Sequence, residues 1–113
     1  MDQEMKKQFD LWHEADEYQK IVDAVLAIDE KERDYEAVSQ LARAYNNLGR
    51  YEEAERLLLS APQPEDSLWH FRLGYAWFYQ ERYEEALREF EETLQLFPGD
   101  EDALIFAGWC RRS

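Results

Sequence analysis

Side chains that could carry out chemistry are few in this chain and stand far apart. The only histidines are His13 and His70, and the single cysteine is Cys110. A nucleophilic thiol needs a base within hydrogen-bond reach, and neither histidine is near Cys110 in the sequence. A zinc site would need histidines or cysteines at ligand spacing, such as two histidines one helical turn apart. These residues therefore predict no catalytic site, no metal site and no cofactor.

Acidic residues are abundant but give no further site. Pairs such as Glu84–Glu85 and Glu91–Glu92 could act as general acid and base, or bind calcium. Neither an EF-hand loop nor a glycine-rich phosphate loop accompanies them. A run of acids at helical spacing is more typical of a solvent-exposed helix face. The chemistry-bearing residues thus favour a protein that binds over one that catalyses.

Composition restricts the partners and the location. The 113 residues carry a net charge of −13, which argues against nucleic acid and against an anionic membrane surface. No apolar run approaches the roughly 18 residues of a membrane span. The segment Met1–Glu4 lacks the layout of a signal peptide, and a lone cysteine fits a reducing compartment. We expect one cytoplasmic domain, 1–113, that binds neither nucleic acid nor membrane.

One sequence pattern occurs three times along the chain. Tyr51-Glu52-Glu53-Ala54 returns 32 residues later as Tyr83-Glu84-Glu85-Ala86, and a weaker copy begins 33 residues earlier at Tyr18. An aromatic residue precedes each copy at the same spacings, namely Trp12, Tyr45 and Trp77. A fixed period of this length indicates a stack of similar units that bury their apolar faces against one another.

Each unit is predicted to be a pair of amphipathic helices. The segments 35–47 and 67–79 carry apolar residues at helical spacing. Gly49 supplies a left-handed stop between the helices of the second unit, and Asp16 and Glu81 stand near the corresponding turns. Pro62, Pro64 and Pro98-Gly99 are predicted to end the second helices of their units. The candidate N-caps of the helices that follow are Asp66 or Ser67, and Asp100. Seven helices result.

These residues resemble the tetratricopeptide repeat, whose pattern is Leu-Gly, an aromatic, a small residue, an aromatic or Leu, another small residue and Pro. The third copy matches best, with Leu73, Gly74, Trp77, Ala86, Phe90 and Pro98. The second copy has Leu41, Ala42, Tyr45, Ala54, Leu58 and Ala61. The first copy is degenerate, because Gln8 and Phe9 stand in place of Leu-Gly. The chain is also similar to small bacterial tetratricopeptide proteins whose role is not established.

The resemblance implies an all-α fold, a right-handed α-solenoid of antiparallel helix pairs. The expected units span about 2–34, 35–66 and 67–100, and a capping helix follows at about 100–112. In such a stack the first helix of each pair lines the concave face and the second lines the convex face. The second helix of the third pair, 81–97, has six acids against two bases, whereas the first, 67–80, has Arg72 and no acid. A nearly neutral, aromatic groove is therefore expected.

The resemblance also implies which residues stand on or beside the concave wall. They are Ser39, Gln40, Arg43, Asn46, Asn47, Phe71, Arg72, Tyr75, Phe78 and Tyr79. Packing of Phe78 and Tyr79 against a neighbouring helix is the alternative. The partner-binding residues are predicted to be Arg43, Asn46, Asn47, Phe71, Arg72, Tyr75 and Tyr79. Aromatic, Arg and amide side chains suit a peptide, including an acidic or carboxyl-terminated one.

Two functional hypotheses follow. The leading one is a non-enzymatic interaction module that binds a peptide or partner segment in its concave groove. Some tetratricopeptide proteins clamp a chaperone's terminal carboxylate, but here only Lys6 and Arg72 match, and Asp10, Gln40 and Leu68 replace the other clamp residues. A chaperone clamp is therefore rejected. The alternative is an assembly protein that forms a homodimer through an exposed apolar stripe on its last helix, namely Leu104, Ile105, Ala107, Gly108 and Trp109.

Overall fold

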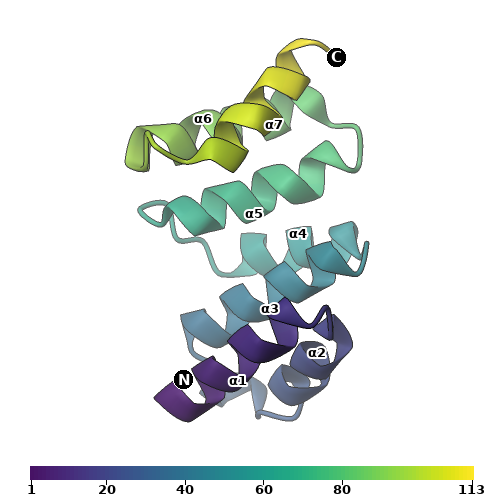
Figure 1. Ribbon diagram of the computed structural model, residues 1–113, viewed down its shortest axis with the longest axis vertical. Helices are drawn as coiled ribbons and strands as arrows, with labels where there is room; N and C mark the ends of the chain where they lie inside the picture. The colour runs from purple at the N-terminus through teal and green to yellow at the C-terminus, as the bar shows by residue number, and fades with distance from the viewer.

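Seven α-helices make up the fold in the computed structural model, which describes residues 1–113. They are α1 (Gln3–Glu14), α2 (Tyr18–Leu26), α3 (Tyr35–Asn47), α4 (Tyr51–Ser60), α5 (Ser67–Phe78), α6 (Tyr83–Leu96) and α7 (Glu101–Arg111). Figure 1 shows the helices stacked from the N-terminal to the C-terminal end of an elongated molecule. The predicted all-α solenoid of helix pairs is confirmed. A short 3-10 helix, Glu30–Glu32, which the sequence pattern does not predict, joins α2 to α3.

An aspartate begins every first helix of the stack. Its carboxylate accepts a hydrogen bond from a backbone N–H in the first turn, and such a cap stabilises a helix by about 1 kcal/mol. The four capping residues are Asp2, Asp34, Asp66 and Asp100. Of these, Asp66 and Asp100 were predicted as N-caps. The second helices α2, α4 and α6 have no side-chain cap, so their start depends on the preceding turn.

The turn within each pair contains one residue in the left-handed region. Gly49 has φ of +79°, and the corresponding Asp16 and Glu81 have φ of +58° and +62°. Left-handed backbone costs a non-glycine residue about 1 kcal/mol, although aspartate tolerates it better than most. All three turns therefore reverse the chain in the same way, and only the second uses glycine.

Close approach between α5 and α6 requires Gly74. A Cβ atom on Gly74 would lie 2.9 Å from Cε1 of Phe90, whose side chain is fully buried. In the second pair, Ala54 and Leu58 of α4 are likewise fully buried. A small residue on α5 thus admits a large apolar side chain from α6.

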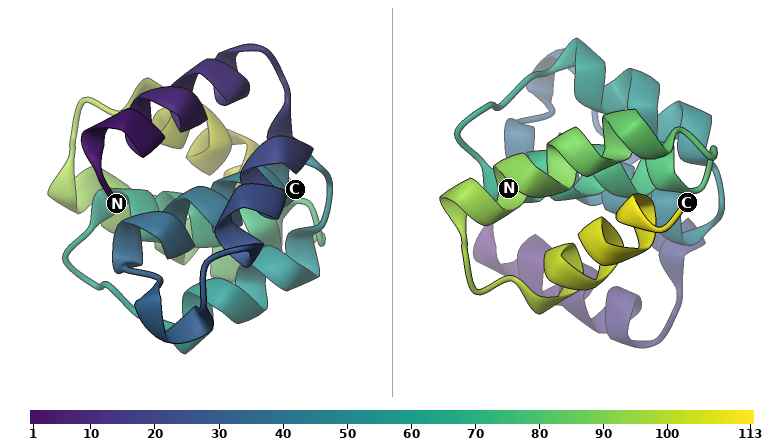
Figure 2. Two further views of the ribbon diagram at one scale, coloured as in Figure 1. Left: turned by 90° about the horizontal axis from the view of Figure 1, so that it is seen from below. Right: turned by 90° about the horizontal axis from the view of Figure 1, so that it is seen from above.

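The buried apolar side chains form three successive clusters along the stack. The first contains residues of α1 to α5 around Phe9, Ile21 and Leu41, and the second lies around Leu58 and Leu73. The third joins α6 and α7 through Ala86, Phe90, Ala107 and Cys110, and Phe71 and Phe106 pack against it. Figure 2, seen from above, shows α7 lying beside α6 at the C-terminal end of the stack. No helix is both long enough and apolar enough to cross a membrane.

Candidate functional site

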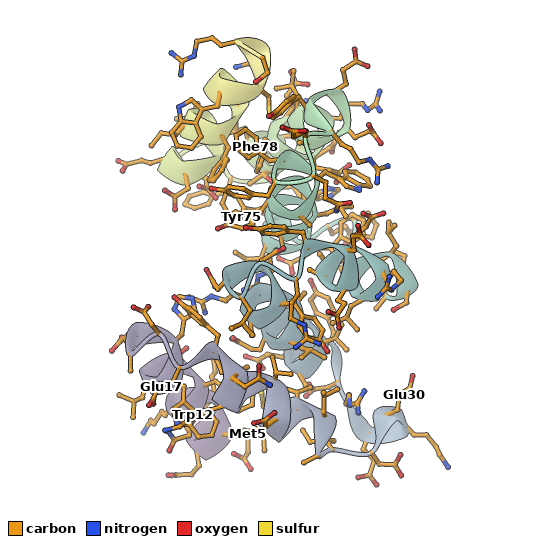
Figure 3. All side chains as sticks on the ribbon, turned by 90° about the vertical axis from the view of Figure 1, so that its right-hand side faces the viewer. Met5, Trp12, Glu17, Glu30, Tyr75 and Phe78 are labelled. Carbon is orange, nitrogen blue, oxygen red and sulfur yellow. The ribbon has the colours of Figure 1, made fainter.

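The four first helices share one face, and a groove with a volume of about 560 Å³ runs along it. That volume lies within the roughly 300–1,000 Å³ of typical ligand pockets. In Figure 3, Tyr75 lies on the side of the stack toward which α1 and α7 project. The groove is lined by His13 of α1, Arg43, Asn46 and Asn47 of α3, Leu68, Phe71, Arg72 and Tyr75 of α5, Asp100, and Asp102 and Phe106 of α7. We call these residues the concave groove.

Six of the seven predicted partner-binding residues line the concave groove. These six are Arg43, Asn46, Asn47, Phe71, Arg72 and Tyr75. Their contact with a partner stays a prediction. Asn46 differs from the rest because it is only 5% exposed and its Nδ2 donates to the backbone carbonyl of Arg72 at 3.0 Å. It therefore joins α3 to α5 within the wall of the groove.

Tyr79 is not part of the groove lining, but its ring lies beside it, with its centroid 4.8 Å from that of Tyr75. Its contact with a partner stays a prediction. Helix α5 ends at Phe78, and Tyr79 is its C-cap residue. Its ring turns toward α4, where it stacks on Tyr51 with the centroids 5.1 Å apart and lines a separate hollow. Phe78 packs against Phe106 and Trp109, which is the packing alternative. Ser39 and Gln40, also expected on or beside the concave wall, are buried and outside the groove lining.

Arg72 is a buried cation without a partner. It is 8% exposed, and its guanidinium takes part in none of the ion pairs of the chain. The nearby Asp66 is engaged elsewhere, because it accepts from the Tyr35 hydroxyl at 2.6 Å and caps α5. Burial lowers the pKa of Arg72 to about 10, so the side chain is charged at neutral pH. A desolvated, unpaired charge destabilises a fold, and an anion in the groove would relieve that cost.

Arg43 is held at the groove by His13, which sequence reasoning did not assign to the site. A guanidinium nitrogen of Arg43 donates to Nδ1 of His13 at 3.0 Å, and Nδ2 of Asn47 lies 3.3 Å from Nε2. Because Arg43 can only donate, Nδ1 of His13 must carry a lone pair. Burial, and then the charge of Arg43, lower the pKa of His13 below its ordinary value. His13 is therefore neutral at neutral pH and leaves the positive charge to the arginines.

The groove lining that the sequence reasoning missed comes mainly from α7. Asp100, Asp102 and Phe106 close the C-terminal end of the groove, and Leu68 is exposed beside them. Phe106 contacts Tyr75 and Phe71 with ring centroids 5.5 Å and 5.9 Å apart. The position of α7 in the repeat could have predicted this lining. Helix α7 follows the third pair in the place of another first helix, and first helices line the concave face.

The remaining chemistry-bearing residues lie away from the groove. His70 is buried and bridges two segments, with Nδ1 2.7 Å from Glu89 Oε1 and Nε2 2.8 Å from the Pro64 carbonyl oxygen. Cys110 is buried in the third core cluster, and burial raises the pKa of its thiol. The structure brings no group of three or more histidine, cysteine, aspartate or glutamate side chains together as metal ligands.

Lys6, which matches a clamp position, and the exposed residues of the predicted apolar stripe lie outside the groove lining. Lys6 forms an ion pair with Glu36 at 3.2 Å and does not line the groove. In the stripe, Leu104, Ile105 and Trp109 are 52%, 48% and 41% exposed. Ala107 is fully buried against α6, so its predicted place in the stripe was wrong.

Comparison with known families identifies the fold. A tetratricopeptide repeat model matches residues 15–74, which is more than half of the chain, and a second model of the same description matches residues 67–100. The chain belongs to the tetratricopeptide repeat family. The matched residues begin after α1, yet the structure places α1 beside α2 as the first helix of a pair, so this tetratricopeptide protein keeps three pairs despite the degenerate first copy.

A solved structure supports the same architecture over nearly the whole tetratricopeptide chain. It is the NMR structure of the second tetratricopeptide domain of human RPAP3, in complex with the HSP70 peptide SGPTIEEVD. The TM-score is 0.78 at 23% identity, and the alignment covers 96% of this chain and 92% of that one. At this identity the likeness concerns the fold. No curated protein gives a significant sequence match.

Proposed function

We propose that this tetratricopeptide protein is a non-enzymatic interaction module whose concave groove binds a peptide segment bearing an acidic group. The observation that carries the proposal is the buried, unpaired guanidinium of Arg72 at the groove. Folding retains this charge at a cost, and a carboxylate is the ligand that would offset it through charge-assisted hydrogen bonds. Arg43 stands beside it as a second cation on the same wall.

The apolar part of the groove suits the rest of a peptide. Phe71 and Tyr75 are half-buried, and their rings lie 6.3 Å apart along one face of α5. Aromatic rings give a large contact area at little entropy cost. Asn47 is exposed at the rim, where its amide would pair with ligand backbone. The RPAP3 domain with which this fold compares binds a peptide with acidic residues near its end, which fits the proposed ligand class. The groove does not match a chaperone clamp, because Leu68 stands where the clamp has a lysine and Gln40 where it has an asparagine.

Replacing Arg72 by methionine tests the proposal, because binding and stability should move in opposite directions. Methionine fills a similar volume without a buried charge, so Arg72→Met should raise the free energy of unfolding by about 1 kcal/mol. Peptides selected from a displayed library on the wild-type protein should lose at least about tenfold in affinity, since a hydrogen bond to a charged group contributes about 1.5–3 kcal/mol. Calorimetry and urea unfolding measure both.

The control is Arg88→Met on the exposed face of α6. This substitution removes the same charge away from the groove and should leave affinity unchanged and stability within about 0.5 kcal/mol. If selected peptides bind Arg72→Met and the wild type equally well, the groove assignment is wrong.

A second candidate function is self-association through α7. It is favoured by the exposure of Leu104, Ile105 and Trp109 on one helix at the end of the stack, because exposed apolar patches commonly mark interfaces. Light scattering of the wild type and of Ile105→Glu separates the two candidates. A dimer that dissociates in Ile105→Glu supports assembly, and a monomer in both proteins refutes it.

A further inference from the structure

Charges of opposite sign line the concave groove on different helices. Arg43 and Arg72 lie on α3 and α5, whereas Asp100 and Asp102 lie at the start of α7. None of these four side chains forms an ion pair within the chain. The groove therefore has no net charge, in a protein whose net charge is −13. We call Arg43 and Arg72 the basic pole of the groove, and Asp100 and Asp102 its acidic pole.

Three aromatic rings, which we call the aromatic floor, line the same groove. Phe71 and Tyr75 of α5 meet Phe106 of α7, with ring centroids 5.5–5.9 Å apart across the helix boundary. None of the four charged side chains pairs with another group of opposite charge in the chain, so each remains available to a ligand.

The acidic pole is accessible and only partly engaged. Oδ1 of Asp100 accepts from the backbone N–H of Ala103 at 3.0 Å, as the cap of α7. Asp102 is exposed and has no hydrogen bond. A ligand that presents only acidic groups would meet repulsion at this pole, and one that presents only basic groups would be repelled by the arginines. Opposed charges within a few ångströms affect both affinity and orientation.

We propose that the ligand of the concave groove is bipolar: a peptide segment with an acidic group at Arg72 and Arg43, an apolar residue over the aromatic floor, and a lysine or arginine at Asp100 and Asp102. The inference rests on the proposed peptide-binding function. It adds a basic group to the ligand and places that group at α7, with the acidic group at α3 and α5. Specificity of this kind comes as much from repulsion of wrong ligands as from attraction of the right one.

Four blocked tetrapeptides test the inference, each with two leucines in the middle. Their end residues are Glu and Lys, Glu and Gln, Gln and Lys, or Glu and Glu, and the readout is a chemical-shift titration of the aromatic resonances of Tyr75 and Phe106. The peptide with Glu and Lys should bind at least about threefold more tightly than either singly charged peptide, as expected for one added ion pair at a partly exposed site. The doubly acidic peptide should bind most weakly of the Glu-bearing three.

A charge reversal at the acidic pole provides the matched variant. Asp102→Lys should weaken the peptide with Glu and Lys and strengthen the doubly acidic one, each by at least about threefold. The control Glu101→Lys makes the same charge change one residue away, at an exposed position outside the groove lining, and should change neither. Asp100 is left intact because it caps α7.

The outcomes separate this inference from the proposed function. If the peptide with Glu and Gln shifts the groove resonances and the added lysine brings no gain, the bipolar ligand is wrong and the acid-binding groove stands. Equal effects of Asp102→Lys and Glu101→Lys also overturn it. If none of the four peptides shifts Tyr75 or Phe106 at millimolar concentration, the proposed function fails together with the inference.

Discussion

Replacing Gly74 by alanine should destabilise the protein, whereas the same replacement at Gly108 should stabilise it. Both glycines lie inside helices, so both gain about 0.5–1 kcal/mol from the better helix propensity of alanine. At Gly74 the new methyl carbon would lie 2.9–3.1 Å from three ring atoms of Phe90. That ring is fully buried between Phe71 and Phe106, so it cannot move away cheaply.

The magnitudes decide the sign at each position. Overpacking of a close-packed core costs about 1–3 kcal/mol, which exceeds the helix gain and leaves Gly74→Ala destabilised by roughly 1 kcal/mol. At Gly108 the nearest atom to the new carbon is the flexible end of Arg112, 4.0 Å away, so the full gain of about 0.5–1 kcal/mol remains. Urea unfolding followed by circular dichroism measures both. If Gly74→Ala is as stabilising as Gly108→Ala, the close approach of α5 and α6 is not a constraint.

Three further predictions concern the turns, the groove histidine and the cysteine. Glu81→Gly should raise the free energy of unfolding by up to about 1 kcal/mol by relieving left-handed backbone, and Gly49→Ala should lower it by about 1 kcal/mol; thermal unfolding of the pair checks both signs. The pKa of His13 should lie below 6.5 in the folded protein, so stability is lost as pH falls from about 6.5 through the folded pKa. Arg43→Gln should raise that pKa in a titration of the His13 ring proton, and an unchanged value would contradict the proposed contact. Cys110, buried and with a raised pKa, should react with a thiol reagent at least about tenfold more slowly in the native than in the unfolded protein, and equal rates would contradict its burial.

Local signals were enough to predict the helices of this protein. The period of 32–33 residues and the glycine and proline positions place all seven helices, because caps and breakers act on their immediate neighbours. The same logic extends to Asp34, which stands one period before Asp66, and to Asp2, which stands one period before Asp34. The sequence reasoning passed over both. Local chemistry, repeated at a fixed interval, explains most of the fold.

The groove was less predictable because its properties arise between helices. Nothing near Arg72 in the sequence indicates that its guanidinium is buried, since burial depends on the packing of α3 against α5 through Asn46. Tyr79 lies only one residue beyond the end of α5, and that offset turns its ring toward Tyr51. The expected neutrality of the groove arises from balance between arginines and the aspartates of α7, not from a lack of charge.

The concave groove draws its lining from four first helices that belong to successive units of the stack. In a solenoid each unit contacts only its neighbours, so the unfolding of one unit is ordinarily only weakly coupled to that of a distant one. A segment lying along this groove would connect α1 to α7, whose buried residues lie in separate core clusters, and it would bind only when both are folded. Occupancy should therefore slow amide exchange in α1 and α7 together, which would make the two ends of the stack behave as one cooperative unit.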